Sequence, residues 1–188
     1  MKLPLVDIKK YGFIVEPRYF FYGWKKSPQI LTRESVAQQL KKAKKLLPRG
    51  YNFKIWDSQR TRETQILMLQ SFYKRIKVNH STWTSKKIWQ EVFKFGAKPV
   101  KVVKLLGTHR LGGSLDMTIV DQNGEELYLG TDMDDLTGKA ALDYYEKKKK
   151  LAGPEKIAKK NRRLLKNIMI KSGFRFVPHE WWHWSYDK

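Results

Sequence analysis

A chain of 188 residues, of which 41% are hydrophobic and 13% aromatic, has the size and composition of one globular domain with a substantial core. It contains no cysteine, which excludes disulfide bonds and metal sites made of thiolates. No apolar run is long enough to cross a bilayer, and residues 1–7 lack the apolar segment of a signal peptide. We therefore expect a cytoplasmic protein without a membrane span, or a periplasmic or exported one if a signal peptide has been removed.

The formal net charge of +21 would attract polyanions. Most of the excess is lysine on expected helix surfaces, such as Lys41, Lys42, Lys44 and Lys45, and the only continuous run is 147–150. Lysines scattered over solvated faces are common, so this distribution argues against nucleic acid as the main partner. A basic module that binds cell-wall polymer or nucleic acid stays the alternative from a different functional class.

The first half of the chain predicts mostly helices. Proline and glycine divide residues 1–32 into irregular structure with short extended pieces. An amphipathic pattern predicts a helix that begins near 32–35 and runs to Leu47, alternation predicts a strand over 51–57, and a second helix is expected over 61–77. Residues 78–107 show a less regular pattern.

The middle of the chain predicts a hairpin. Residues 114–120 alternate well enough to form a strand with Leu115, Met117 and Ile119 on one face, which directs Asp116 to the other face. The Asn123–Gly124 pair is typical of a tight turn, because both positions accept positive φ. We therefore expect a return strand over 125–130.

The last third predicts two helices, over 139–151 and 155–171, followed by an aromatic-rich extended segment over 174–186. No repeat or linker-like stretch divides the chain. The elements together predict a single α+β domain, residues 1–188, in which helices flank a small central antiparallel sheet that carries a zinc site.

Two segments far apart in the sequence contain the residue types of a zinc hydrolase. A catalytic zinc ion takes three protein ligands with nitrogen or oxygen donors and keeps a further position for water. His109 and Asp116 flank the Gly112–Gly113 pair, which permits a tight reversal between them, and His183 lies near the end of the chain. These three residues are the predicted ligands, and Glu180 is the predicted general base.

A second interpretation competes for part of this set, because residues 179–183 read H-E-x-x-H. In zincins both histidines of this motif ligate zinc from one helix and the glutamate acts as the base. Pro178 just before the motif and the β-forming flanks argue against a helix here. Both interpretations include Glu180 and His183 and differ on whether His179 replaces His109 and Asp116.

Several segments resemble those of the D-alanyl-D-alanine dipeptidases, the VanX-like zinc peptidases, and they occur in the same order. The resemblance runs from about Leu3 to Tyr186 and rests on GTHRLGGSLDMT, EWWHW, LPLVDI, LLPRGYNFKIWDSQR and NRRLLKNIMIKSGF. It implies an enzyme that uses one zinc ion to cleave D-Ala-D-Ala, a small peptide substrate. It places His109, Asp116 and His183 on the ligand positions, Glu180 on the base, and Arg60 on the arginine that stabilises the transition state.

The same resemblance implies three substrate-binding residues, Tyr19, Asp57 and Thr108. It also marks a departure over 131–138, where this chain lacks a clear counterpart of the acid that holds the amino terminus of the dipeptide. Asp134 or Asp135 is the expected substitute. Within the same reaction class, the alternative is a D,D-carboxypeptidase or a hydrolase of peptidoglycan stem peptides.

Overall fold

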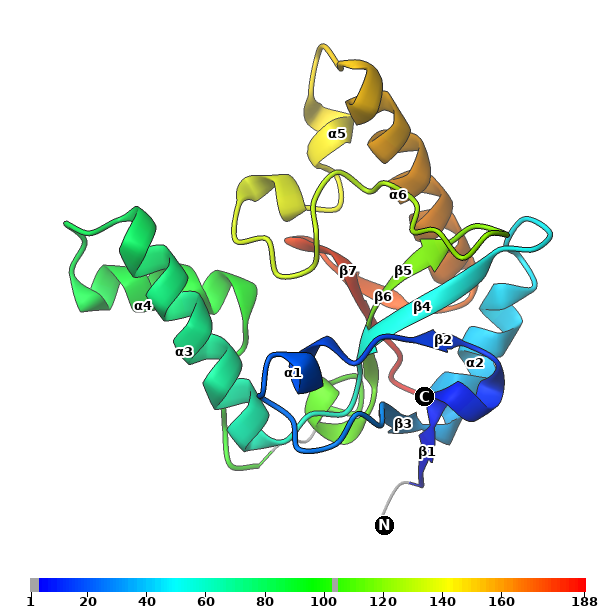
Figure 1. Ribbon diagram of the computed structural model, residues 1–188, viewed down its shortest axis with the longest axis horizontal. Helices are drawn as coiled ribbons and strands as arrows, with labels where there is room; N and C mark the ends of the chain where they lie inside the picture. Colours follow the sequence, from blue (N-terminus) through cyan, green and yellow to red (C-terminus); the bar gives the residue numbers. More distant parts are fainter. Residues whose placement is uncertain (1–3, 103–104) are drawn as a thin grey trace.

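The computed structural model describes residues 4–102 and 105–188, and a five-stranded sheet with the order β2-β4-β5-β7-β6 lies at its centre (Figure 1). The five strands are β2 (Ile14–Val15), β4 (Asn52–Asp57), β5 (Ser114–Val120), β7 (Glu180–Ser185) and β6 (Arg175–Val177). β2 runs parallel to β4, and the other neighbours are antiparallel. A two-stranded sheet pairs β1 (Leu5–Asp7) with β3 (Leu31–Arg33). The predicted α+β class is confirmed, and the parallel edge strand is an addition to it.

Four longer helices surround the sheet: α2 (Glu34–Lys44), α3 (Arg62–Asn79), α4 (Ser85–Phe95) and α6 (Gly153–Lys171). The shorter helical elements are α1 (Arg18–Phe21), α5 (Tyr144–Lys147), η1 (Ile8–Tyr11), η2 (His109–Leu111) and η3 (Gly138–Ala140). In Figure 1, α3 and α4 form a pair at the left, whereas α2 and α6 lie at the right. Within the described ranges, none of the helices combines the length and the apolar character that crossing a membrane requires.

The central strand β5 explains how a carboxylate comes to lie inside the protein. All seven residues of β5 are buried, because β4 and β7 pair with its two edges and other elements cover both faces. Leu115 and Met117 point to one face, where Met117 pairs with Ile55. By alternation Asp116 and Thr118 belong to the other face. The predicted strand 114–120 is confirmed, and its polar residues turn out to be buried as well.

Helix α4 was not predicted from the sequence. It begins after Thr84, whose hydroxyl accepts a hydrogen bond from the backbone N–H of Lys87, and it buries Ile88 and Val92 one turn apart against α3. The expectation of less regular structure over 78–107 is therefore wrong for these eleven residues. The cap residue and the Ile88–Val92 spacing were the available signals.

The predicted return strand over 125–130 is also wrong, although the predicted turn is present. Gly124 has a φ of +83°, and Val120 forms an isolated bridge with Glu126. β7 already pairs with this edge of β5 from Ser114 to Asp116, so the returning chain has to leave the sheet. Competition for a strand edge between distant segments is not visible in local sequence.

The predicted helix over 139–151 is replaced by η3 and the short α5, and Arg162 provides the physical reason. The buried guanidinium of Arg162 donates hydrogen bonds to the carbonyls of Leu129 at 2.7 Å, Ala141 at 2.6 Å and Lys139 at 2.9 Å. A continuous helix would need the carbonyls of 139 and 141 for its own hydrogen bonds. Burial lowers the pKa of Arg162 to about 10, so the group remains charged at neutral pH.

Arg162→Met is expected to lower the free energy of unfolding by about 3 kcal/mol, because three buried carbonyls lose a charged donor. The matched control is Arg163→Met. Arg163 lies on the exposed side of the same helix, α6, and its guanidinium pairs with Glu146 of α5. An exposed pair of this kind contributes less than about 1 kcal/mol. Denaturant unfolding of the two variants measures the difference, and equal losses would contradict this role of Arg162.

Candidate metal centre

A glycine pair positions the first candidate ligand. His109 opens η2, and Gly112 ends it in the left-handed region with a φ of +67°. A Cβ on Gly113 would lie 1.8 Å from the carbonyl oxygen of Leu106, so only glycine fits where the two backbones meet. The N–H of Gly113 donates to the carbonyl of Thr108 at 2.8 Å, which closes the loop around His109.

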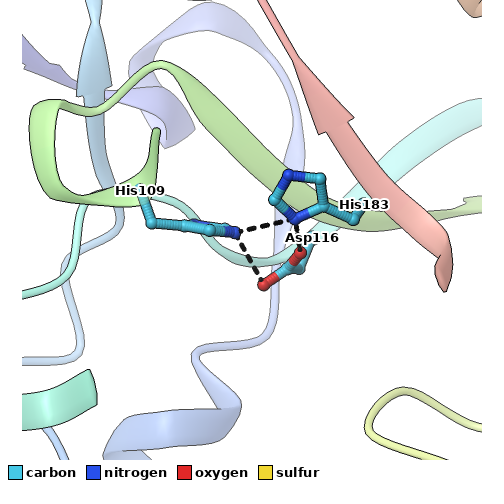
Figure 2. Close-up of side chains that lie close together, drawn as sticks. All are labelled: His109, Asp116 and His183. Carbon is cyan, nitrogen blue, oxygen red and sulfur yellow. Dashed lines mark hydrogen bonds and ion pairs between the residues drawn. The ribbon is translucent and has the colours of Figure 1, made fainter. Parts of the chain in front are cut away.

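The other two candidate ligands form a cross-strand pair. Asp116 on β5 lies directly opposite His183 on β7, so their side chains are neighbours on one face of the sheet. His109 Nε2 lies 3.1 Å from His183 Nδ1 and 3.2 Å from Asp116 Oδ2, and His183 Nδ1 lies 3.2 Å from Asp116 Oδ1. Figure 2 shows the two rings and the carboxylate directed toward one point.

Both rings are held by a polar group on their outer side. His109 Nδ1 lies 2.6 Å from the carbonyl oxygen of Ser58, which only accepts, so Nδ1 carries the proton and Nε2 presents its lone pair. His183 Nε2 lies 3.0 Å from Ser185 Oγ, a hydroxyl that can accept its proton. With both outer nitrogens protonated, His109 Nε2 and His183 Nδ1 would direct their lone pairs toward a cation shared with the Asp116 carboxylate.

The donor set fits a divalent metal ion. Two imidazole nitrogens and a carboxylate are ligands that zinc accepts at about 2.0–2.2 Å, and tetrahedral bonds of that length place ligand atoms about 3.3 Å apart. The separations of 3.1 to 3.2 Å between the three groups agree with this value. These residues are the group that satisfies the metal-ligand geometry among the described residues.

Glu180 reaches the same place because β7 is irregular. A separation of three residues would put Glu180 and His183 on opposite faces of a regular strand. The β6–β7 register shifts between Phe176 and Val177, so that Val177 pairs with Glu180, and Glu180 Oε2 lies 3.7 Å from His183 Nδ1. Burial, followed by the charges of Asp116 and Asp134, raises the pKa of Glu180 well above its usual value.

The zincin interpretation does not fit this geometry. The motif lies on strand β7 rather than on a helix, so His179 and His183 are not on adjacent helical turns. His179 is exposed in the turn before the strand. His109 and Asp116, rather than His179, lie beside His183.

Arg60 lies beside the candidate ligands, between two carboxylates. Its Nη2 donates to Asp116 Oδ2 at 3.0 Å, its Nε lies 3.0 Å from Asp57 Oδ2, and its guanidinium lies 5.2 Å from the centre of the Tyr19 ring. Burial would lower the pKa of Arg60, but the charges of Asp57 and Asp116 outweigh that effect and raise it. The group is therefore a permanent buried cation beside the candidate ligands.

A cavity of about 640 Å³ opens beside these residues, and its lining includes Tyr19, Arg60, Thr108, Glu180 and the three candidate ligands. Tyr19 is buried, and its hydroxyl lies 3.3 Å from Asp134 Oδ1. Thr108 lines the cavity, although its hydroxyl donates to the carbonyl of Leu105. Asp57 is buried and contacts Arg60, His109 and Lys25, so it meets the site through Arg60 and His109.

Several residues at the site had not been assigned a role from the sequence. Ser58 holds the His109 ring, and Met68 contacts both Arg60 and Tyr19. Of the two acids considered as substitutes, Asp134 lines the cavity. Its φ of +59° is unusual for a residue other than glycine, and burial together with the charge of Asp116 raises its pKa to about 7. The side-chain contacts of Ser58 and Met68 depend on tertiary structure and leave no signal in local sequence.

Three convergent candidate ligands, a cavity and a half-buried carboxylate beside them are the arrangement expected of a metallopeptidase centre. A family model agrees: residues 23–188 match the Peptidase M15 family, described as D-ala-D-ala dipeptidase. The chain belongs to this family, which confirms the resemblance inferred from its motifs.

One individual relative shows a low sequence identity. The chain is 28% identical over 102 residues to a D-alanyl-D-alanine dipeptidase from Synechocystis sp., in a match that covers 52% of this chain. The match spans about two fifths of the length of that relative, 41%.

Two solved structures resemble the fold. VanYB in complex with D-alanine-D-alanine has a TM-score of 0.51 and 18% identity over 87% of this chain and 76% of that chain. A vancomycin resistance D,D-pentapeptidase VanY in complex with Zn(II) has a TM-score of 0.49 and 16% identity over 87% and 77%.

Proposed function

We propose that this protein is a zinc-dependent dipeptidase that hydrolyses D-alanyl-D-alanine, with His109, Asp116 and His183 as ligands. The observation that carries the proposal is the convergence of three side chains, whose ligand atoms all lie within 4.8 Å of one another, with the carboxylate of Glu180 beside them. Membership of a family described as D-ala-D-ala dipeptidase supports the choice of substrate. Zinc, when bound, would lower the pKa of a water molecule and polarise the scissile carbonyl.

Glu180 is the proposed general base. Its carboxylate lies 3.7 Å from His183 Nδ1, and burial raises its pKa, which makes the carboxylate a stronger base. It would take a proton from the attacking water and deliver it to the leaving amine. No other carboxylate among the cavity-lining residues described lies as close to His183 without being a candidate ligand.

Arg60 is the proposed donor to the oxyanion that develops on the scissile carbonyl. Its guanidinium is held by Asp57 and Asp116, so it is oriented before substrate arrives, and such fixed donors stabilise charge that appears only in the transition state. In this account Asp57 is a positioning residue for Arg60.

Arg60→Lys is expected to lower kcat by about 100-fold or more, because one ammonium cannot reach both carboxylates and the oxyanion. KM should change much less than kcat. Steady-state kinetics on D-alanyl-D-alanine measure both quantities, and zinc content measured on the same variant serves as the control. A kcat within a few-fold of the wild type would rule out this role.

Asp134 and Tyr19 are the proposed binding site for the substrate amino terminus. Asp134 lines the cavity, and its second oxygen, Oδ2, has no hydrogen-bond partner among the described residues. A buried acceptor without a partner costs free energy, and a substrate ammonium group would satisfy it.

The size of the cavity favours a second candidate function, a D,D-carboxypeptidase or stem-peptide hydrolase. A volume of about 640 Å³ leaves room beyond a dipeptide of two small residues. Turnover of free D-alanyl-D-alanine should be compared with turnover of a muropeptide that ends in the same two residues. The dipeptidase proposal expects efficient cleavage of the free dipeptide, and cleavage of the longer peptide alone would reject it.

A zinc assay and a dipeptide hydrolysis assay on one preparation test the proposed function as a whole. We expect one zinc ion per chain and hydrolysis that a chelator abolishes and zinc restores. A chain without stoichiometric zinc that behaves identically after Glu180→Ala would instead support a basic binding module.

A further inference from the structure

The active-site cavity is lined by more cations than the proposed chemistry uses. Besides Arg60, its walls include Arg62, Lys94, Lys98 and Arg110. Three of these four lie on α3, α4 and the segment after α4, away from the candidate ligands in the sequence. A cavity wall with this charge favours an anionic group on the ligand.

Neighbouring groups occupy most of these cations. Arg60 is paired with Asp57 and Asp116, and Lys94 is paired with Glu91 at 2.7 Å. Lys98 lies over the Phe93 ring, 5.0 Å from its centre. Each of these groups already has a partner that a ligand would have to share.

Arg62 is held in place without being neutralised. Its Nε donates to the carbonyl of Pro99 at 3.0 Å, which fixes the guanidinium against the segment after α4. No carboxylate lies within ion-pair distance of Arg62 among residues 4–102 and 105–188. The half-buried Arg62 lines the cavity, and a guanidinium has the planar arrangement of donors that matches a carboxylate.

We propose that Arg62 binds the free C-terminal carboxylate of the peptide substrate and thereby makes this enzyme specific for the last peptide bond. The inference rests on the proposed peptidase function and adds the residue that sets the position of cleavage. The acids that line the cavity, Asp116, Asp134 and Glu180, belong to the metal centre and the proposed amine site, whereas Arg62 belongs to the wall next to Pro99. This distribution suits a peptide with an ammonium group at one end and a carboxylate at the other.

The test compares D-alanyl-D-alanine with its C-terminal amide in the wild type, Arg62→Gln and Arg62→Lys. For the free acid, we expect Arg62→Gln to raise KM by ~10-fold to ~100-fold with kcat nearly unchanged, because a hydrogen-bonded charge pair is lost from binding. The amide should be a poor substrate of the wild type, and Arg62→Gln should leave its kcat/KM unchanged. For the free acid, the KM of Arg62→Lys should lie between the KM of the wild type and that of Arg62→Gln.

Arg49→Gln is the matched control, since it removes the same charge from an exposed turn at the opposite end of β4. Arg49→Gln should leave kcat and KM unchanged for both the acid and the amide. Equal losses for acid and amide in Arg62→Gln, or no loss for either, would overturn the assignment of Arg62.

Binding separates this inference from the proposed function. Calorimetry of D-alanyl-D-alanine and its amide on zinc-loaded Glu180→Gln should give tighter binding of the acid by ~10-fold or more, and the additional change Arg62→Gln should remove that difference. If neither peptide is hydrolysed by the wild type, the proposed function fails, and this binding difference still decides the role of Arg62. Equal binding of acid and amide would overturn it.

Discussion

Glu180→Gln is expected to lower kcat for D-alanyl-D-alanine by about 100-fold to 10,000-fold while the zinc content stays at one ion per chain. Glutamine keeps the size and most of the hydrogen bonding of the side chain but cannot accept the proton of the attacking water. Glu180 is not one of the three convergent donors, so its replacement should leave the metal group intact. Kinetics and metal analysis on one preparation check both parts.

The pH dependence of stability provides a second measurement on the same variant, because it depends on the pKa of Glu180. Because burial raises that pKa, the folded metal-free protein binds a proton that the unfolded chain has already released above its ordinary pKa of 4.5, so this group makes the fold less stable as pH rises. Glu180→Gln removes that contribution. The metal-free variant should therefore gain stability over the metal-free wild type as pH rises from about 5 toward neutral.

Retained activity in Glu180→Gln would contradict the role of Glu180 as the base.

His109→Ala is expected to abolish stoichiometric zinc binding and, with it, hydrolysis. The variant removes one of the three proposed protein donors, so the loss of affinity should exceed the ~100-fold that changes in residues behind the ligands cause. Equilibrium dialysis against zinc measures the affinity. Circular dichroism should show an intact fold, because the His109 ring packs against polar groups rather than in the apolar core.

His179→Ala is the matched control for this experiment. It removes a histidine one residue from Glu180, but His179 is exposed and lies outside the convergent group. We expect unchanged zinc content and activity. Loss of zinc in His179→Ala together with its retention in His109→Ala would instead favour the H-E-x-x-H interpretation.

The sequence predicted those parts of the fold that local pattern determines. The strands over 51–57 and 114–120 and the helices over 61–77 and 155–171 agree with the structure within two residues at each end. The alternation in 114–120 was enough to separate Asp116 from the apolar face, and the glycine pair was enough to expect a reversal after His109. Local sequence largely specifies the backbone conformation of these residues, so they could be predicted without knowledge of distant contacts.

The predictions that failed depend on distant residues. The stretch over 125–130 does not form a strand because β7, about sixty residues later, pairs with the edge it would need. The helix over 139–151 does not form because Arg162 binds carbonyls that the helix would use. Likewise, the 3.7 Å approach of Glu180 to His183 depends on a register shift in β7 that its sequence alone does not indicate.

The site residues differ in the same way in how far the sequence identifies them. His109, Asp116, His183 and Glu180 carry distinctive chemistry, so residue type and family resemblance identified them as candidates. Arg62 and Ser58 resemble ordinary surface or loop residues in the sequence, and only the contacts with Pro99 and His109 distinguish them.

A crystal structure of the zinc-loaded protein, with anomalous data at the zinc edge, tests the central claim most directly. We predict one strong peak about 2.0–2.2 Å from His109 Nε2, His183 Nδ1 and an oxygen of Asp116, with a further position open toward Glu180. A stoichiometric zinc peak at His179, or at any place where these three side chains do not meet, would contradict the account.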